Sequence, residues 1–305
     1  MTDRVRPDAG PIRSLLFVPG HRERWVEPAR SSGADAIVFD LEDAVPVAEV
    51  DAAREVVRQA VDRQEPGSPR LLVRTGPPGT EAMVADLDAV VAPGLAGVMM
   101  PLVTRPDEVA DMDRRLTDLE EARGMAVGST AITPLVETAG AARFAYEIAA
   151  ASDRVAYMGG GTSRQGDVAR SIGFQWTAEG NETLTLRSWV LLCVRAAGVP
   201  FPISGMWSVV DDRDGLRAFA EQTRGLGYSG CMVIHPSHVP VVNEVFTPSA
   251  AEVARWQEVI TVMREAQGRG VGAIRHDGEL IDEAHVKTAE RGLALARRLG
   301  TAVDG

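Results

Sequence analysis

Apolar runs of strand length alternate with amphipathic stretches of helix length along most of this chain. Eight of the runs are continuously apolar, which is typical of parallel strands whose two faces are both covered. They lie at residues 13–19, 36–40, 71–74, 96–100, 132–136, 154–158, 199–204 and 231–234. Helices are predicted at 23–32, 47–62, 81–91, 107–123, 182–197 and 215–226, from 237 onward, and at 249–268, and a turn into a helix begins at 138–140.

Eight strand–helix units in roughly 240 residues have the size of a (β/α)₈ TIM barrel, and this α/β fold is our prediction. A doubly wound open sheet is the alternative. The turn at 19–24 lacks the GxGxxG pattern of that fold, and the glycine-rich stretch 159–163 lacks the lysine of a P-loop. These glycines would either let the backbone approach a ligand or metal closely or give the loop ordinary flexibility.

The composition shifts after residue 268. Residues 273–278 predict a hairpin or a turn, and a helix follows from 282 to 299. We therefore expect a barrel catalytic domain at 1–268. The C-terminal extension at 269–305 would serve as a lid over a barrel mouth or as an oligomerisation element.

Two carboxylates follow successive predicted strands. Glu137 comes directly after the run 132–136, and Asp167 lies in the glycine-rich loop after the next run. Because the carboxyl ends of barrel strands face one crevice, the two side chains are expected to lie about one strand spacing apart. Hard oxygen ligands in that number suit Mg²⁺, which keeps several waters. The alternative is that Glu137 caps a helix and Asp167 is an ordinary loop acid.

Composition narrows the class of protein. Apolar residues make up 45% of the chain, enough for a sizeable core, and the net charge of −11 comes without a basic block. Nucleic acid is therefore not an expected partner. Cys193 and Cys231 form no CxxC pair and are interpreted as core residues in a reducing compartment. The chain has no apolar run of about 18 residues, so no membrane partner is expected. Its start, 1–7, has no apolar signal core, which predicts a cytoplasmic protein.

Several stretches together resemble one known family, the HpcH/HpaI aldolase and citrate lyase family, on the side of the citrate lyase beta subunit and malyl-CoA lyase. The matching stretches are Arg13-Ser-Leu-Leu-Phe-Val-Pro-Gly20, 34–45, 73–74, Pro134-Leu-Val-Glu-Thr-Ala139, 234–236, 243–248 and 281–282. The resemblance implies a TIM barrel, Mg²⁺, and reversible carbon–carbon cleavage of a 3-hydroxyacyl thioester to an acyl thioester and a keto acid. It also implies a homotrimer or hexamer.

The same resemblance implies roles for individual residues. Glu137 and Asp167 would be the Mg²⁺ ligands. Arg74, a catalytic and substrate-binding residue, would clamp the keto-acid carboxylate with its bidentate fork. Glu42 and Asp43 would hold the waters of the metal and contact the substrate.

Three further residues take roles from the resemblance. Phe17 and Arg24 would contact the substrate. Asp282 would handle a proton in catalysis, as the tail aspartate that reaches an adjacent subunit's site does in the family, while an N-cap of the last helix is the alternative. His235, followed by proline after a buried strand, is interpreted as structural.

The chain departs from the family at positions that commonly carry charge. Pro28, Leu102 and Cys231 stand where lysine is common, Gly76 replaces an asparagine, and Ser204 replaces an aspartate. Since the polyphosphate of CoA favours basic residues, the use of CoA is left open. The alternatives are a CoA-independent hydroxy-keto-acid aldolase, thioester hydrolysis after condensation, and a non-catalytic ligand-binding relative.

Overall fold

The computed structural model describes residues 9–160 and 162–301 of the chain. The stretch 1–7, on which the absence of a signal core was judged, lies outside this range, as do Gly161 and the last four residues of the expected extension. The chain divides into two compact units, Met1–Glu244 and Val245–Gly305. Each is described by itself.

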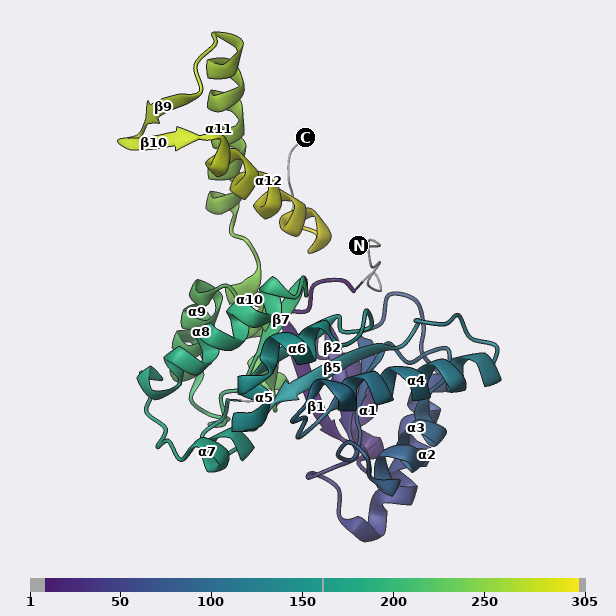
Figure 1. Ribbon diagram of the computed structural model, residues 1–305. Coiled ribbons are helices and arrows are strands. Elements are labelled where there is room, and N and C mark those ends of the chain that lie inside the picture. Colours follow the sequence, from purple (N-terminus) through teal and green to yellow (C-terminus); the bar gives the residue numbers. More distant parts are fainter. Residues whose placement is uncertain (1–8, 161, 302–305) are drawn as a thin grey trace. The chain divides into compact units, whose positions relative to one another are not determined.

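The first unit is built around eight parallel strands that close into a barrel in chain order (Figure 1). The strands are β1 Ser14–Pro19, β2 Ala36–Asp40, β3 Arg70–Arg74, β4 Gly97–Met100, β5 Ala131–Val136, β6 Tyr157–Gly160, β7 Phe201–Ser204 and β8 Gly230–Val233. Closure between β1 and β8 confirms the predicted TIM barrel and rules out the open sheet. The strands are almost wholly buried, which explains their continuous apolar character.

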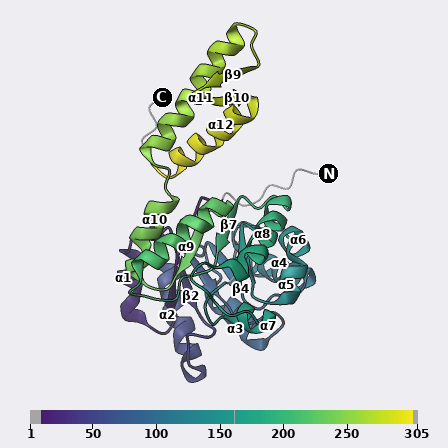
Figure 2. The same cartoon turned by 90° about the vertical axis from the view of Figure 1, so that its left-hand side faces the viewer.

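Helices cover the outside of the barrel, as two views of the ribbon show (Figure 2). They are η1 Glu23–Trp25, α1 Val26–Arg30, η2 Val47–Glu49, α2 Val50–Asp62, α3 Glu81–Val90, α4 Pro106–Ala122, α5 Ala139–Arg143, α6 Ala145–Ala150, α7 Asp167–Ile172, α8 Asn181–Ala196, α9 Arg213–Leu226, η3 Pro236–His238 and α10 Val239–Phe246. The helix expected at 23–32 is broken into η1 and α1. Pro28 explains the break, because it has no N–H to donate to the carbonyl of Arg24.

Alternation along the strands separates two layers of side chains. Every second residue points into the barrel, where Leu15, Val38, Leu72, Met99 and Met232 belong to one buried cluster. At the carboxyl ends of β2 and β3 the inward positions become polar. The barrel is therefore a packed core that carries its chemistry on one rim.

The sixth strand lies later than the sequence predicted. The run 154–158 was expected, but β6 is Tyr157–Gly160, and Val155 makes only an isolated bridge with Ile132. Arg154 is drawn into a buried ion network instead, where it binds Asp113 and Glu120. Gly159 lies within this strand, and the position requires glycine because a Cβ there would lie 1.4 Å from the carbonyl oxygen of Ile203. This glycine serves strand packing, not the approach of a ligand.

The second unit consists of a hairpin and two helices. Its elements are α11 Ala250–Gly268, β9 Ala273–His276, β10 Glu279–Asp282 and α12 Glu283–Arg298. The hairpin turns through Asp277 and Gly278, both at positive φ, as an Asp-Gly turn favours. Side chains from α11 pack with Ile281 and Ala289 in one cluster, so α11 belongs with this unit. The unit thus begins at Val245, earlier than the expected boundary at 268.

Within residues 9–160 and 162–301, no helix has an apolar stretch long enough to span a lipid bilayer.

Candidate active site

Arg74 and Asp40 form the fixed centre of the site. They end β3 and β2, and parallel pairing places them opposite each other. Arg74 donates from Nε to Asp40 Oδ1 (2.7 Å) and from Nη2 to Asp40 Oδ2 (2.6 Å). Its Cζ lies 5.5 Å from the centroid of the Phe17 ring, so the cation also rests on an aromatic face. Phe17 therefore contacts the residue expected to bind substrate.

The charge of Arg74 is secured by its surroundings. Burial lowers the pKa of the guanidinium, but the hydrogen bonds to Asp40 and the charges of Glu42 and Glu137 outweigh burial and raise the pKa above its ordinary value. Arginine offers five N–H donors, and Asp40 takes two of them. Donors on Nη1 and Nη2 thus remain for a further acceptor.

Asp40 has a role that the sequence analysis did not assign. Its side chain is almost fully buried and accepts from the backbone N–H of Glu42 (3.0 Å) and Ala44 (3.1 Å) as well as from Arg74. One carboxylate therefore orients Arg74 and shapes the loop that carries Glu42 and Asp43. A signal was present in the sequence, since Asp40 and Arg74 occupy the last positions of neighbouring predicted strands.

Glu42 and Asp43 approach Arg74 from the loop after β2. Glu42 Oε2 lies 2.9 Å from Arg74 Nη1, although the geometry does not make a hydrogen bond, and Asp43 Oδ2 lies 3.9 Å from the same nitrogen. Burial raises the pKa of Glu42 to about 7, against the lowering effect of Arg74 and with further contributions from Asp43, Glu137 and Asp40. Glu42 is a crowded acid, whereas Asp43 is mostly exposed.

Glu137 follows β5 and is 9% exposed. The backbone N–H of Leu102 donates to its Oε2 (3.1 Å). Leu102 has a positive φ of 51°, an uncommon conformation for a leucine, which aims this N–H at the carboxylate. Burial raises the pKa of Glu137, the Leu102 bond and Arg74 lower it, and Asp167 and Asp43 raise it further. Asp167 thus adds negative charge to the surroundings of Glu137.

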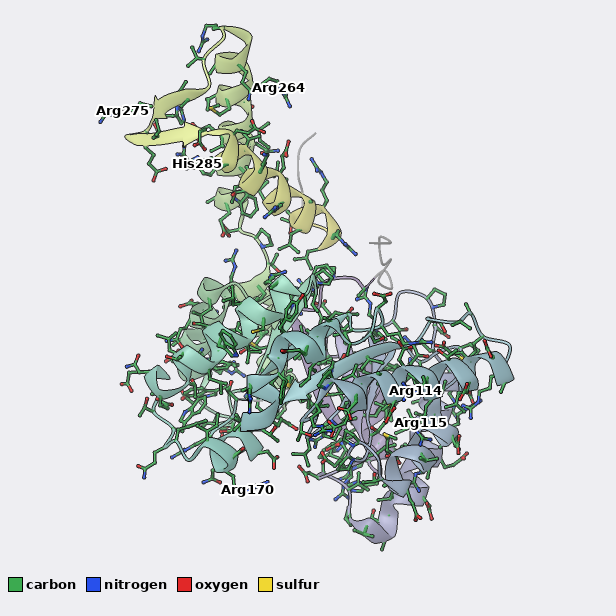
Figure 3. The ribbon with its side chains drawn as sticks, in the orientation of Figure 1. Arg114, Arg115, Arg170, Arg264, Arg275 and His285 are labelled. Carbon is green, nitrogen blue, oxygen red and sulfur yellow. The ribbon has the colours of Figure 1, made fainter. Side chains whose placement is uncertain are left out.

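Asp167 begins α7. It forms an ion pair with Arg170, which is labelled in Figure 3 and points into solvent with a side chain that is 75% exposed. An exposed pair of this kind holds its members weakly. The carboxylate of Asp167 can therefore exchange Arg170 for another cation.

The residues present fit a divalent cation. Glu42 and Glu137 both interact with the charge of Arg74, whose own fork is engaged by Asp40. Their carboxylate oxygens, like those of Asp43 and Asp167, are hard ligands. Burial is the main cause of the raised pKa values of Glu42 and Glu137, neighbouring carboxylates add to it, and a bound cation would favour the ionised forms. Glu137 and Asp167 provide the one or two direct carboxylates that Mg²⁺ commonly takes.

A cavity of about 680 Å³ adjoins Arg74 and Asp40. Most of its lining is apolar: Leu16, Phe17, Val18, Pro19, Trp25, Pro28, Ala29, Ala44, Met206, Ile234 and Pro236, with Asp40, Arg74 and His235 as the charged or polar members. The interpretation of His235 as purely structural is thus incomplete, since its ring forms part of the cavity wall. Arg24 is exposed and is not among the lining residues, so the structure does not bring it to the centre of the site.

Asp282 lies in the second unit, where it caps α12. Its Oδ1 accepts from the backbone N–H of Ala284 (3.0 Å) and lies 2.7 Å from Nδ1 of His285, which is labelled in Figure 3. These two contacts lower the pKa of Asp282, the contact with His285 most. The N-cap alternative is confirmed, and the proton-handling role stays a prediction.

Another group of possible ligands occurs in the second unit. Among the described residues, Glu258, His276 and Asp277 have ligand atoms within 4.8 Å of one another. Arg255 donates to both acids (3.2 and 3.1 Å), so these carboxylates are already engaged in an ion network.

The chain is similar in sequence to known proteins. The profile of the family described as HpcH/HpaI aldolase/citrate lyase matches residues 13–236. The chain is 33% identical over 284 residues to the citrate lyase subunit beta of Leuconostoc mesenteroides subsp. cremoris, with 93% of each chain covered. It is 33% identical over 291 residues to a (3S)-malyl-CoA thioesterase of Cereibacter sphaeroides, with 95% of this chain and 96% of the relative covered.

Solved structures agree. The crystal structure of the protein CitE from Mycobacterium tuberculosis in complex with magnesium, acetoacetate and coenzyme A matches with a TM-score of 0.75 and 27% identity, over 95% of this chain and 99% of that one. A citrate lyase beta subunit from M. tuberculosis complexed with oxaloacetate and magnesium matches with a TM-score of 0.63 and 27% identity, over 81% and 100% of the two chains.

Proposed function

The chain belongs to the HpcH/HpaI aldolase/citrate lyase family, and on that premise we propose that it is a Mg²⁺-dependent carbon–carbon lyase. Its substrate would be a 3-hydroxyacyl thioester such as malyl-, citramalyl- or citryl-CoA, cleaved reversibly to an acyl-CoA and a keto acid. The observation that carries the proposal is the cluster of Glu137 and Asp167 with the fixed cation Arg74 on the carboxyl rim of the barrel.

Glu137 and Asp167 would hold the metal directly, with Glu42 and Asp43 orienting its waters. When bound, Mg²⁺ supplies a Lewis acid that polarises the keto and carboxylate oxygens of the keto-acid half. Arg74 would bind the carboxylate of that half through the donors that Asp40 leaves open. Because Asp40 holds the guanidinium in place, little side-chain freedom is lost when substrate binds.

Asp282 would handle the proton. Its lowered pKa keeps it a carboxylate at neutral pH, so it is ready to accept the proton of the 3-hydroxyl group. Loss of that proton turns the C–O bond into a carbonyl, the carbon–carbon bond breaks, and its electron pair forms an enolate on the acyl half. The same carboxyl group would then return the proton to the α-carbon. We further propose a cytoplasmic homotrimer or hexamer, as the family resemblance implies.

The test is a cleavage assay on malyl-CoA, citramalyl-CoA and citryl-CoA with Mg²⁺ or with EDTA, detecting the released keto acid. We expect Mg²⁺-dependent release that Glu137→Gln abolishes. Glu147→Gln, an exposed substitution of the same type on α6, serves as the matched control and should leave activity unchanged. Release from the free hydroxy acids alone would identify a CoA-independent aldolase. No release and no Mg²⁺ binding would leave a non-catalytic binding relative.

Thioester hydrolysis is a second candidate, supported by the relative named (3S)-malyl-CoA thioesterase. A lyase converts malyl-CoA into a keto acid and an acyl-CoA, whereas a thioesterase releases free CoA thiol. Measuring keto acid and thiol in the same reaction separates the two outcomes.

A further inference from the structure

His235 stands at the mouth of the barrel with the residues of the candidate active site. Val233 ends β8 and pairs with Leu16 of β1, so His235, two residues later, lies about level with Val18. Both residues line the cavity that also contains Arg74 and Asp40. The imidazole therefore borders the space into which a substrate bound at Arg74 would extend.

Hydrogen bonding fixes the tautomer of His235. Its Nδ1 accepts from the backbone N–H of Ser237 (3.2 Å) and lies 2.8 Å from the Ser237 hydroxyl oxygen. A nitrogen that accepts a backbone N–H carries no proton, so the proton of the neutral ring lies on Nε2. Among the described residues, no group binds Nε2. His235 thus presents one N–H donor of known position.

Few other side chains in the cavity wall can donate a hydrogen bond. The remaining lining is apolar except for Asp40, for Arg74, whose donors beyond the Asp40 fork are assigned to the keto-acid carboxylate, and for the indole N–H of Trp25. A mostly apolar wall suits an uncharged arm of a substrate, and a single carbonyl on that arm needs one donor. His235 is exposed in the free protein, and a thioester arm bound over the ring would shield it from water and so strengthen its hydrogen bond to developing negative charge.

We propose that the cavity binds the thioester arm of the substrate and that His235 donates its Nε2–H to the thioester carbonyl oxygen. This inference rests on the proposed function. In the cleavage step the hydroxyl proton passes to the carboxylate base and the carbon–carbon bond breaks. The bond's electron pair delocalises onto the thioester oxygen as an enolate, and the proton then returns to the α-carbon. His235 keeps its own proton and stabilises the oxyanion, so no further reactant is required.

Kinetics of matched variants test the role. His235→Ala should lower kcat for thioester cleavage by about 10²–10³-fold, the effect of removing one oxyanion donor, with KM little changed. His235→Gln keeps an N–H donor and should recover part of the loss. Glu147→Gln, the exposed control variant on α6, should stay within threefold of the parent. A kcat of His235→Ala within threefold of the parent would overturn the proposal.

A binding measurement separates this proposal from the proposed function. In the full-length protein with Mg²⁺, ¹⁵N resonances of His235, assigned by their loss in His235→Gln, should show the Nε2–H tautomer. Saturating acetyl-CoA should shift the Nε2 resonance. This holds whether or not the protein cleaves any hydroxyacyl thioester tested. An unchanged His235 resonance under acetyl-CoA would overturn the role of the histidine even in an active enzyme.

Discussion

Arg74 is surrounded by more negative charge than it can neutralise, and the position of Asp40 determines which acids can form hydrogen bonds with it. Since Asp40 takes the side-on fork of the guanidinium and two backbone N–H groups, Glu42 is left close to Arg74 without a hydrogen bond. The roles are divided: Asp40 has its hydrogen bonds satisfied within the protein, whereas Glu42 and Glu137 are acids whose pKa values burial raises. In the proposed function, this arrangement would be preorganised for metal and substrate together.

Asp40→Asn tests this division. The substitution removes one buried charge and one acceptor from the fork, and breaking a buried ion pair costs about 3–5 kcal/mol of unfolding free energy. The nearby Glu42 should keep the loss at the lower end of that range. Urea denaturation measures it. Asp62→Asn breaks the exposed pair with Arg58 and should cost less than about 1 kcal/mol. Equal losses in the two variants would refute the buried role of Asp40.

The pH dependence of Mg²⁺ binding follows from the raised pKa values. Glu42 has a pKa of about 7, against an ordinary value of 4.5, and the pKa of Glu137 is also raised. A protonated carboxyl is neutral and must lose its proton before it can attract a cation, so Mg²⁺ affinity should rise up to about tenfold per pH unit below 7 and level off above about 8, with protons released on binding. Calorimetry in two buffers of different ionisation enthalpy counts those protons.

Glu42→Gln provides the control for the pH series. It removes the group whose pKa is near 7 and should flatten the dependence between pH 6 and 8, leaving the part that belongs to Glu137. In the metal-free protein the sign is the reverse. A carboxyl whose folded pKa is raised favours the folded state below 4.5, and that contribution is lost as pH rises through about 7. Mg²⁺ affinity that is constant from pH 6 to 8 would contradict the assignment.

At the scale of elements, the strands could be predicted because buried parallel strands are continuous apolar runs bounded by turns. The sixth failed for a physical reason: Arg154 looks like the polar start of a strand, but its charge is used by Asp113 and Glu120. The site residues could be predicted because they lie at or after the carboxyl ends of predicted strands. Asp40 and Arg74 end neighbouring predicted strands, which indicates that they lie close together, but their direct pairing depends on the register between β2 and β3, which no local pattern contains.

The packing of α12 on α11 yields a prediction about stability. A Cβ at Gly292 of α12 would lie 2.6–2.7 Å from ring atoms of Trp256 on α11. Gly292→Ala should therefore destabilise the second unit by about 1–3 kcal/mol, as overpacking does, even though alanine favours a helix. Gly268→Ala, on α11 with nothing within 4 Å, should be neutral or stabilising by up to about 1 kcal/mol. Thermal melts followed by circular dichroism compare the two, and a variant Gly292→Ala as stable as Gly268→Ala would be unexpected.

At the scale of the whole molecule, the proposed chemistry draws on both compact units. The residues proposed to bind the metal and the keto acid belong to Met1–Glu244, whereas Asp282, the proposed proton carrier, belongs to Val245–Gly305. The second unit has its own hydrophobic clusters, hairpin and capped helix. It is therefore a folded unit with a core of its own. The two roles of Asp282, helix cap and proposed proton carrier, can be separated by substitution. Asparagine caps a helix as well as aspartate does but cannot act as a base.

Subunit complementation decides which chain supplies Asp282. Arg74→Ala and Asp282→Asn should each be nearly inactive alone, with Asp282→Asn as stable as the parent. If Asp282 acts in a neighbouring copy, as the family resemblance implies, co-expression of the two variants rebuilds intact sites. Random mixing in a closed ring gives about a quarter of the parent activity. An intact site needs an Asp282→Asn chain, which supplies Arg74, next to an Arg74→Ala chain, which supplies Asp282, and each of the two is in place about half of the time. We expect this recovery in Mg²⁺-dependent keto acid release. Activity that stays at the level of the single variants would place Asp282 and Arg74 of each working site in one chain.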